Sequence, residues 1–157
     1  SEVGKGTAFQ VFIPARDGAA GDPDDDLERT RPRGGTETIL LVEDEKSVRE
    51  LTRMLLKRHG YQVLECENGV EALEVWADHR ERIQLLLTDL VMPAGISGLQ
   101  LARRLRNENP NLKIIFTTGY SAEAAGNAFE LRIGENFLQK PYPPEELLRT
   151  IRHTLDR

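Results

Sequence analysis

Short apolar runs alternate with segments of helical period along most of the chain. The runs span residues 39–42, 63–66, 85–88, 114–117 and 137–138. Between them, apolar residues recur every three or four positions, which is the spacing of one face of a helix. Repeated strand–helix units of this kind predict an α/β fold, in which a parallel sheet carries helices on both faces because its crossovers are right-handed.

The helices have recognisable ends. The first has an apolar stripe of Val48, Leu51, Met54 and Leu55 and stops at Gly60 after a basic last turn, which predicts an amphipathic, properly capped helix. Further start signals are Asn68, Ser97 and the pair Pro143 and Pro144. Between residues 121 and 134 glycine interrupts the helical pattern, so a short or mobile fourth helix is expected there.

The first 35 residues lack this regular pattern. Apolar residues alternate with others over 8–13, which predicts one strand, and residues 4–14 resemble the closing segment of a histidine kinase ATP-binding domain. Residues 15–35 hold five Asp, four Gly and two Pro, with Leu27 as the only large apolar residue. The composition therefore predicts a flexible linker at 15–35 and a separate domain at 36–157, and the resemblance implies a kinase-domain remnant at 1–14.

Charge and cysteine content narrow the function classes. Asp and Glu outnumber Lys and Arg by 26 to 21, a net charge of -5, so neither nucleic acid nor an anionic membrane is an expected direct partner. Cys66 is the only cysteine, which excludes an internal disulfide and fits a reducing, cytoplasmic location. No apolar run approaches the roughly 20 residues that a membrane-spanning helix needs.

Polar side chains follow four of the five predicted strands. In chain order they are Glu43 and Asp44, Asp89, Thr117 and Thr118, and Lys140. Parallel sheets bind ligands beyond the carboxyl ends of their strands, so these groups are expected to converge. Three carboxylates in one place repel one another and call for a cation, and Mg²⁺ fits best because it prefers oxygen ligands. We expect Mg²⁺ to stabilise the fold by relieving this repulsion.

The same residues suggest phosphoryl chemistry. Asp89 can act as a nucleophile toward phosphorus and form an acyl phosphate. The metal, Lys140 and the Thr118 hydroxyl would then neutralise and hold the phosphoryl oxygens.

Four motifs in this order resemble the response-regulator receiver domain over residues 36–157. They are Glu43-Asp44-Glu45, Thr88-Asp89-Leu90-Val91-Met92-Pro93, Thr118-Gly119-Tyr120 and Lys140-Pro141-Tyr142. The resemblance implies a flavodoxin-like, doubly wound sheet of five parallel strands in the order 2-1-3-4-5. It also implies phosphorylation of Asp89, with Mg²⁺ bound by Asp44, Asp89 and the Val91 main-chain carbonyl, and with Glu43 acting through water.

The resemblance further implies how the site responds. Lys140 pairs with the phosphate, Thr118 moves toward it, Phe137 rotates inward, and the Lys140-Pro141 peptide bond is cis. Two departures are visible: the loop 93–98 is one residue longer than in compact members, and Phe137 lacks the hydroxyl of the tyrosine common at that position. A packed aromatic with no switching role is the alternative for Phe137.

The order of segments predicts the C-terminal part of a hybrid sensor histidine kinase. None of His59, His79 and His153 is followed by an acidic residue in the manner of a phosphodonor histidine, so the donor is expected elsewhere. The predicted partner is a histidine kinase dimerisation and phosphodonor domain or a histidine phosphotransfer protein. It would dock on the first helix and on the loop after Lys140. The chain itself would catalyse at most its own phosphorylation and dephosphorylation, and homodimerisation stays open.

Three other functions are alternatives for a chain with this pattern. An aspartyl-phosphate phosphatase would carry a second acid two residues after the nucleophile, where this chain has Val91. A flavin-binding domain would need a phosphate-binding Ser/Thr/Gly loop after the first strand, which is missing. The third alternative is an unphosphorylated interaction module with a vestigial pocket. It ranks second, below the phosphorylated receiver, because none of the expected pocket residues is missing.

Overall fold

The structure is a computed structural model that describes residues 34–92, 95–119 and 136–157. All of these lie in one compact unit, residues 32–157. The predicted N-terminal strand, most of the predicted linker, the start of the loop 93–98 and the expected helix between 121 and 134 lie outside the described residues. None of the described helices is both long enough and apolar enough to span a bilayer.

The sheet has five parallel strands in the order β2-β1-β3-β4-β5, which confirms the predicted fold class. The strands are β1 Thr38–Val42, β2 Gln62–Cys66, β3 Ile83–Asp89, β4 Lys113–Thr118 and β5 Phe137–Gln139. Each contains one predicted apolar run and extends it by one or two residues at one end or at both ends. The central strand β1 is buried along its whole length, as a strand covered on both faces must be.

Four helices are described: α2 Lys46–Arg58, α3 Gly69–His79, α4 Gly98–Glu108 and α5 Pro144–Leu155. Three of these helices, α3, α4 and α5, begin at the predicted start signals. The Asn68 side chain accepts from the first turn of α3, Ser97 and Gln100 form a capping box on α4, and Pro144 opens α5. In contrast, Glu45 precedes α2 without a side-chain capping bond.

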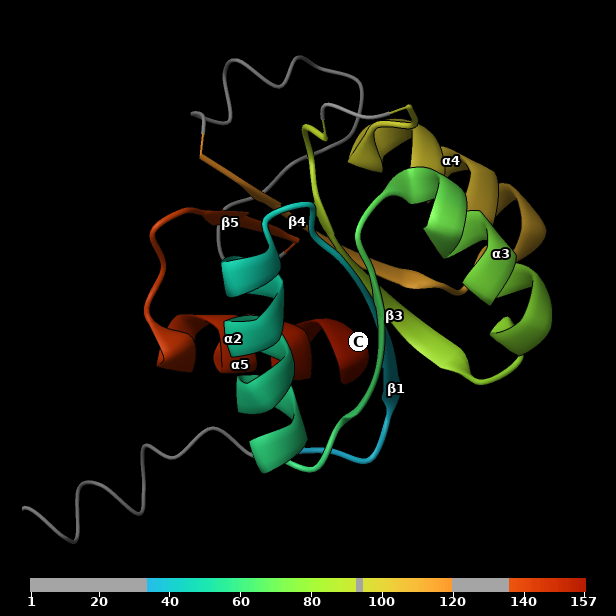
Figure 1. The fold of residues 1–157 in the computed structure, drawn as a ribbon. Helices are drawn as coiled ribbons and strands as arrows, with labels where there is room; N and C mark the ends of the chain where they lie inside the picture. Colours follow the sequence, from blue (N-terminus) through green and yellow to red (C-terminus); the bar gives the residue numbers. More distant parts are fainter. Residues whose placement is uncertain (1–33, 93–94, 120–135) are drawn as a thin grey trace, which may run out of the picture. The chain divides into compact units, whose positions relative to one another are not determined.

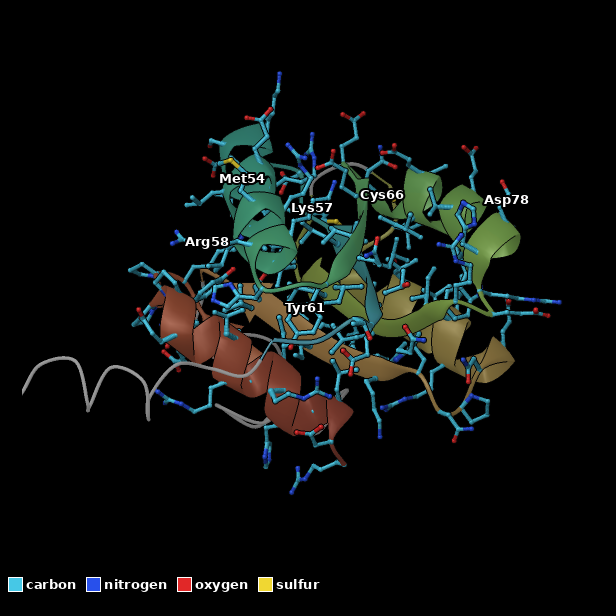
Figure 2. All side chains as sticks on the ribbon, turned by 90° about the horizontal axis from the view of Figure 1, so that it is seen from below. Met54, Lys57, Arg58, Tyr61, Cys66 and Asp78 are labelled. Carbon is cyan, nitrogen blue, oxygen red and sulfur yellow. The ribbon has the colours of Figure 1, made fainter. Side chains whose placement is uncertain are left out.

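The helices cover both faces of the sheet, with α2 and α5 on one side and α3 and α4 on the other (Figure 1). Each face has its own apolar cluster, because successive strand residues point to opposite sides. Leu40 and Leu86 pack with Trp76 of α3, whereas Ile39 and Leu85 pack toward α2 and α5. Tyr61, labelled in Figure 2, belongs to the second cluster. The two clusters hold the strand ends in fixed register.

The apolar stripe of α2 does not all face the sheet. Leu51 is 65% exposed and Met54, which Figure 2 labels, is 56% exposed, while the buried residues of the helix are Thr52 and Leu56. Leu55 is half-buried against the cluster beside α5. The inward face therefore runs through positions 52, 55 and 56, and part of the predicted stripe lies on the surface.

A second polar cluster lies at the amino-terminal edge of the sheet. Arg152 Nη2 of α5 lies 2.8 Å from Glu37 Oε1 and 2.8 Å from Asp156 Oδ1. The bond to Arg152 lowers the pKa of Glu37 below its usual 4.5, although burial opposes this. The ion pair ties the residue before β1 to the last helix.

We expect Glu37→Gln to lower the free energy of unfolding by about 1 kcal/mol near neutral pH. A carboxyl group with a lowered folded-state pKa contributes stability that is complete above its unfolded-state pKa and is lost as the pH falls through the folded-state value. The difference between wild type and variant should thus shrink as the pH falls below 4.5. Urea unfolding over a pH series measures it, with Glu50→Gln on the surface of α2 as the control. A difference that stays constant down to strongly acidic pH would contradict this.

Candidate functional site

Three carboxylates converge at the carboxyl edge of the sheet. Glu43 and Asp44 follow β1, and Asp89 is the last residue of β3. Because β1 and β3 are parallel neighbours, with Val42 opposite Thr88, the residues that end them emerge side by side. One carboxylate oxygen from each acidic residue lies within 4.8 Å of the others. The predicted acidic cluster is therefore present in the structure.

The cluster is buried on one side and open on the other. Glu43 is 3% exposed and Asp89 is 9% exposed, whereas Asp44 is exposed. Asp89 Oδ1 accepts a hydrogen bond of 3.0 Å from the Val91 main-chain N–H, which fixes one carboxylate oxygen. The arrangement combines two buried carboxylates with a third that solvent and a partner can reach.

Lys140 bridges the two buried carboxylates. Its Nζ lies 2.6 Å from Glu43 Oε2 and 2.7 Å from Asp89 Oδ2. The strand β5 places it there, since the Lys140 N–H donates to the Thr118 carbonyl of β4. The Lys140-Pro141 peptide bond is cis, as the resemblance implied. Lys140 is thus an integral part of the site.

Burial and the neighbouring charges together set the pKa values of Glu43 and Lys140. Burial would lower the pKa of Lys140, but its hydrogen bonds to Asp89 and Glu43 outweigh this and raise it. Burial raises the pKa of Glu43, and Lys140 offsets this only in part. Three carboxylates against one ammonium group leave an excess of two negative charges. An oxygen-rich site with this charge suits a hard divalent cation such as Mg²⁺.

The other predicted residues lie close by in the fold. Thr118 ends β4 and is 1% exposed, and Thr117 accepts through its carbonyl from the Leu90 N–H. Phe137 begins β5 and is fully buried in the cluster on the α3 and α4 side. Val91 presents an exposed side chain, and its N–H is the group bonded to Asp89. The proposed roles of the Val91 carbonyl in metal binding and of Phe137 in switching stay predictions.

Arg49 is a contact of this site that the sequence pattern did not indicate. Its Nη1 donates to the main-chain carbonyls of Glu43, at 2.5 Å, and Asp44, at 3.3 Å. In the sequence it is one of several charged residues of α2, and their spacing does not indicate which of them contacts the site.

The comparison with protein families decides what kind of domain this is. The family model of the response regulator receiver domain matches residues 39–152, which include every residue of the acidic cluster and Lys140. The chain belongs to the response regulator receiver domain family. It is a receiver domain of the kind found in two-component systems, in which the phosphoacceptor role is general.

Two relatives show that similar sequences occur both within a longer kinase and as a short receiver protein. The chain is 35% identical over 164 residues to sensor kinase CckA of Brucella abortus (strain 2308), a match that covers 100% of the chain and 17% of that kinase. It is 37% identical over 117 residues to the response regulator receiver protein CpdR of the same organism, covering 74% of the chain and 95% of that protein. The chain thus spans only a small part of one relative and nearly the whole of another.

Solved structures agree with this assignment. The receiver domain from the hybrid histidine kinase CckA superposes with a TM-score of 0.63 at 34% identity and covers 75% of this chain and 98% of that one. A response regulator receiver protein from Sinorhizobium medicae WSM419 gives a TM-score of 0.68 at 28% identity, covering 77% and 95%. These likenesses confirm the predicted receiver fold.

Proposed function

We propose that Asp89 accepts a phosphoryl group from a phosphohistidine in a two-component phosphorelay, with Mg²⁺ at the acidic cluster. The observation that carries the proposal is the position of Lys140, whose Nζ lies within 2.7 Å of both Glu43 and Asp89. An ammonium group held there can meet the negative charge of a phosphoryl group on Asp89. The exposed Asp44 beside it leaves the site open to a donor.

The chemistry requires one bond to form and one to break. A carboxylate oxygen of Asp89 bonds to phosphorus while the P–N bond to the donor imidazole breaks, and the imidazole leaves with the bonding electrons. The Lys140 ammonium group and the Thr118 hydroxyl hold the phosphoryl oxygens. The residues that would bind Mg²⁺ are Asp44, Asp89 and the Val91 carbonyl, with Glu43 acting through water. Bound there, the ion would neutralise charge on the transferred group.

The phosphodonor is proposed to be a histidine kinase domain or a histidine phosphotransfer protein. The exposed Leu51 and Met54 on α2 support a docking surface near the site, because apolar side chains on a surface helix suit a partner helix. Sensor kinase CckA of Brucella abortus matches this chain over its full length, including residues 1–35. This supports a hybrid sensor kinase context, with a kinase-domain remnant at 1–14. A cytoplasmic location is proposed from the sequence, whose single cysteine fits a reducing compartment.

Incubation with acetyl phosphate and Mg²⁺, followed by intact mass measurement, tests the proposal. We expect wild type to gain the mass of one phosphoryl group, and Asp89→Asn to gain none because an amide oxygen is a poor nucleophile. The matched control is Asp78→Asn, an exposed aspartate of α3 labelled in Figure 2, which should behave as wild type. EDTA should prevent the adduct. A folded wild type that never gains mass would instead indicate the unphosphorylated interaction module.

A further inference from the structure

Glu43 and Asp44 lie in the segment between β1 and α2. No side-chain capping bond at the start of α2 holds this segment in place. Glu45, the residue before α2, makes no side-chain capping bond, and the first turn of the helix contains no acidic residue. The Glu45 carboxylate accepts from the Ser47 hydroxyl at 2.6 Å instead. The start of the segment is fixed, since the Glu43 N–H donates to the Cys66 carbonyl of β2. The stretch after it needs another anchor.

Arg49 provides that anchor. It lies one turn into α2, half-buried, and its Nη1 donates to the carbonyl oxygens of both Glu43 and Asp44. Hydrogen bonds from a charged donor are stronger than neutral ones, and the guanidinium group presents several donors in one fixed plane. One side chain thereby holds the main chain at both acidic residues.

The two acidic residues depend on this anchor to different degrees. The Glu43 carboxylate is also fixed by Lys140 at 2.6 Å. Among the described residues, the Asp44 carboxylate has no ion pair, so its main chain is what limits where the side chain can reach. Loss of the Arg49 contacts should therefore affect Asp44 more than Glu43.

We propose that Arg49 is a positioning residue of the metal centre, which sets the main chain of Glu43 and Asp44 so that their carboxylates converge with Asp89. This inference rests on the proposed Mg²⁺ site. Partners that orient metal ligands from behind typically contribute a factor of about 10 to 100 in metal affinity. Arg49 contacts these two residues through their main-chain carbonyls and leaves their carboxylates to the ion.

Calorimetric titration of the metal-free protein with MgCl₂ tests the role. We expect Arg49→Gln to weaken Mg²⁺ binding about tenfold. Arg49→Lys should fall between this variant and wild type, since an ammonium group can reach a carbonyl but not with the same planar geometry. The matched control is Arg53→Gln, one turn further along α2, whose charge pairs with Glu65 at 3.2 Å. It should bind Mg²⁺ within about twofold of wild type.

Urea unfolding without Mg²⁺ separates positioning from a merely structural role. A variant that loses stability but keeps the Mg²⁺ affinity of wild type would overturn the inference, and so would an equal weakening in Arg53→Gln. If Arg49→Gln does not fold, the comparison of Arg49→Lys with wild type decides. A wild-type protein that binds no Mg²⁺ would refute the proposed metal site itself, a result that is visible before any variant is compared.

Discussion

Replacing Lys140 with methionine should lower the free energy of unfolding of the metal-free domain by about 3 kcal/mol. The methionine keeps the apolar stem but leaves the carboxylates of Glu43 and Asp89 buried beside each other with no countercharge. Breaking a buried pair by removing one partner is costly for this reason. The lower end of the usual range applies because the Lys140 side chain is 22% exposed.

Urea unfolding measures the loss, and two further variants test its cause. Lys46→Met removes an exposed lysine that pairs weakly with Glu50 at 3.9 Å, so its effect should be small. Adding Glu43→Gln to Lys140→Met should recover part of the lost stability, because it removes one of the uncompensated charges. Saturating Mg²⁺ should also reduce the loss. A Lys140→Met domain as stable as wild type would contradict the expectation.

The fold could be predicted because its signals are local. A strand buried on both faces must be apolar throughout, and the run 39–42 shows this directly. Asn68 and Ser97 precede their helices in sequence and cap them in the structure, since a capping bond spans only two or three residues. The convergence of Glu43 and Asp89 follows from the same logic, because neighbouring parallel strands end at one edge.

What could not be predicted depends on distances between remote side chains. Leu51 and Met54 fit an inward stripe by spacing, but the packing of α2 on β1 and β2 turns Thr52 and Leu56 toward the sheet instead. The contact of Arg49 with two carbonyls likewise depends on one side-chain conformation across the turn before α2. Periodicity does not contain that information.

Gly98 offers a second large effect, because it lies directly against the phosphoacceptor. It is the first residue of α4 and is buried. A Cβ at this position would overlap the main-chain carbonyl oxygen of Asp89 and come within 2.9 Å of Thr88 Oγ1. The absence of a side chain therefore lets α4 begin beside the end of β3, and the backbone there has no flexible group that could move aside.

Gly98→Ala should accordingly destabilise the domain by about 2 kcal/mol, as overpacked sites usually do. The sign is informative, since Gly→Ala within a helix ordinarily stabilises by up to about 1 kcal/mol. The atom that must shift belongs to Asp89, so the distance between Asp89 and Lys140 should change as well. We therefore expect slower labelling by acetyl phosphate in addition to a lower urea midpoint.

The matched control is Gly119→Ala, directly after β4, the strand that pairs with β3. A Cβ on Gly119 would meet no atom of the described residues within 4 Å, so this substitution should leave both measurements close to those of wild type. If Gly98→Ala were as stable as wild type and labelled at the same rate, α4 would have room to move away from β3. The close approach of α4 would then be dispensable for holding Asp89, whose position would depend on β3 and on Lys140.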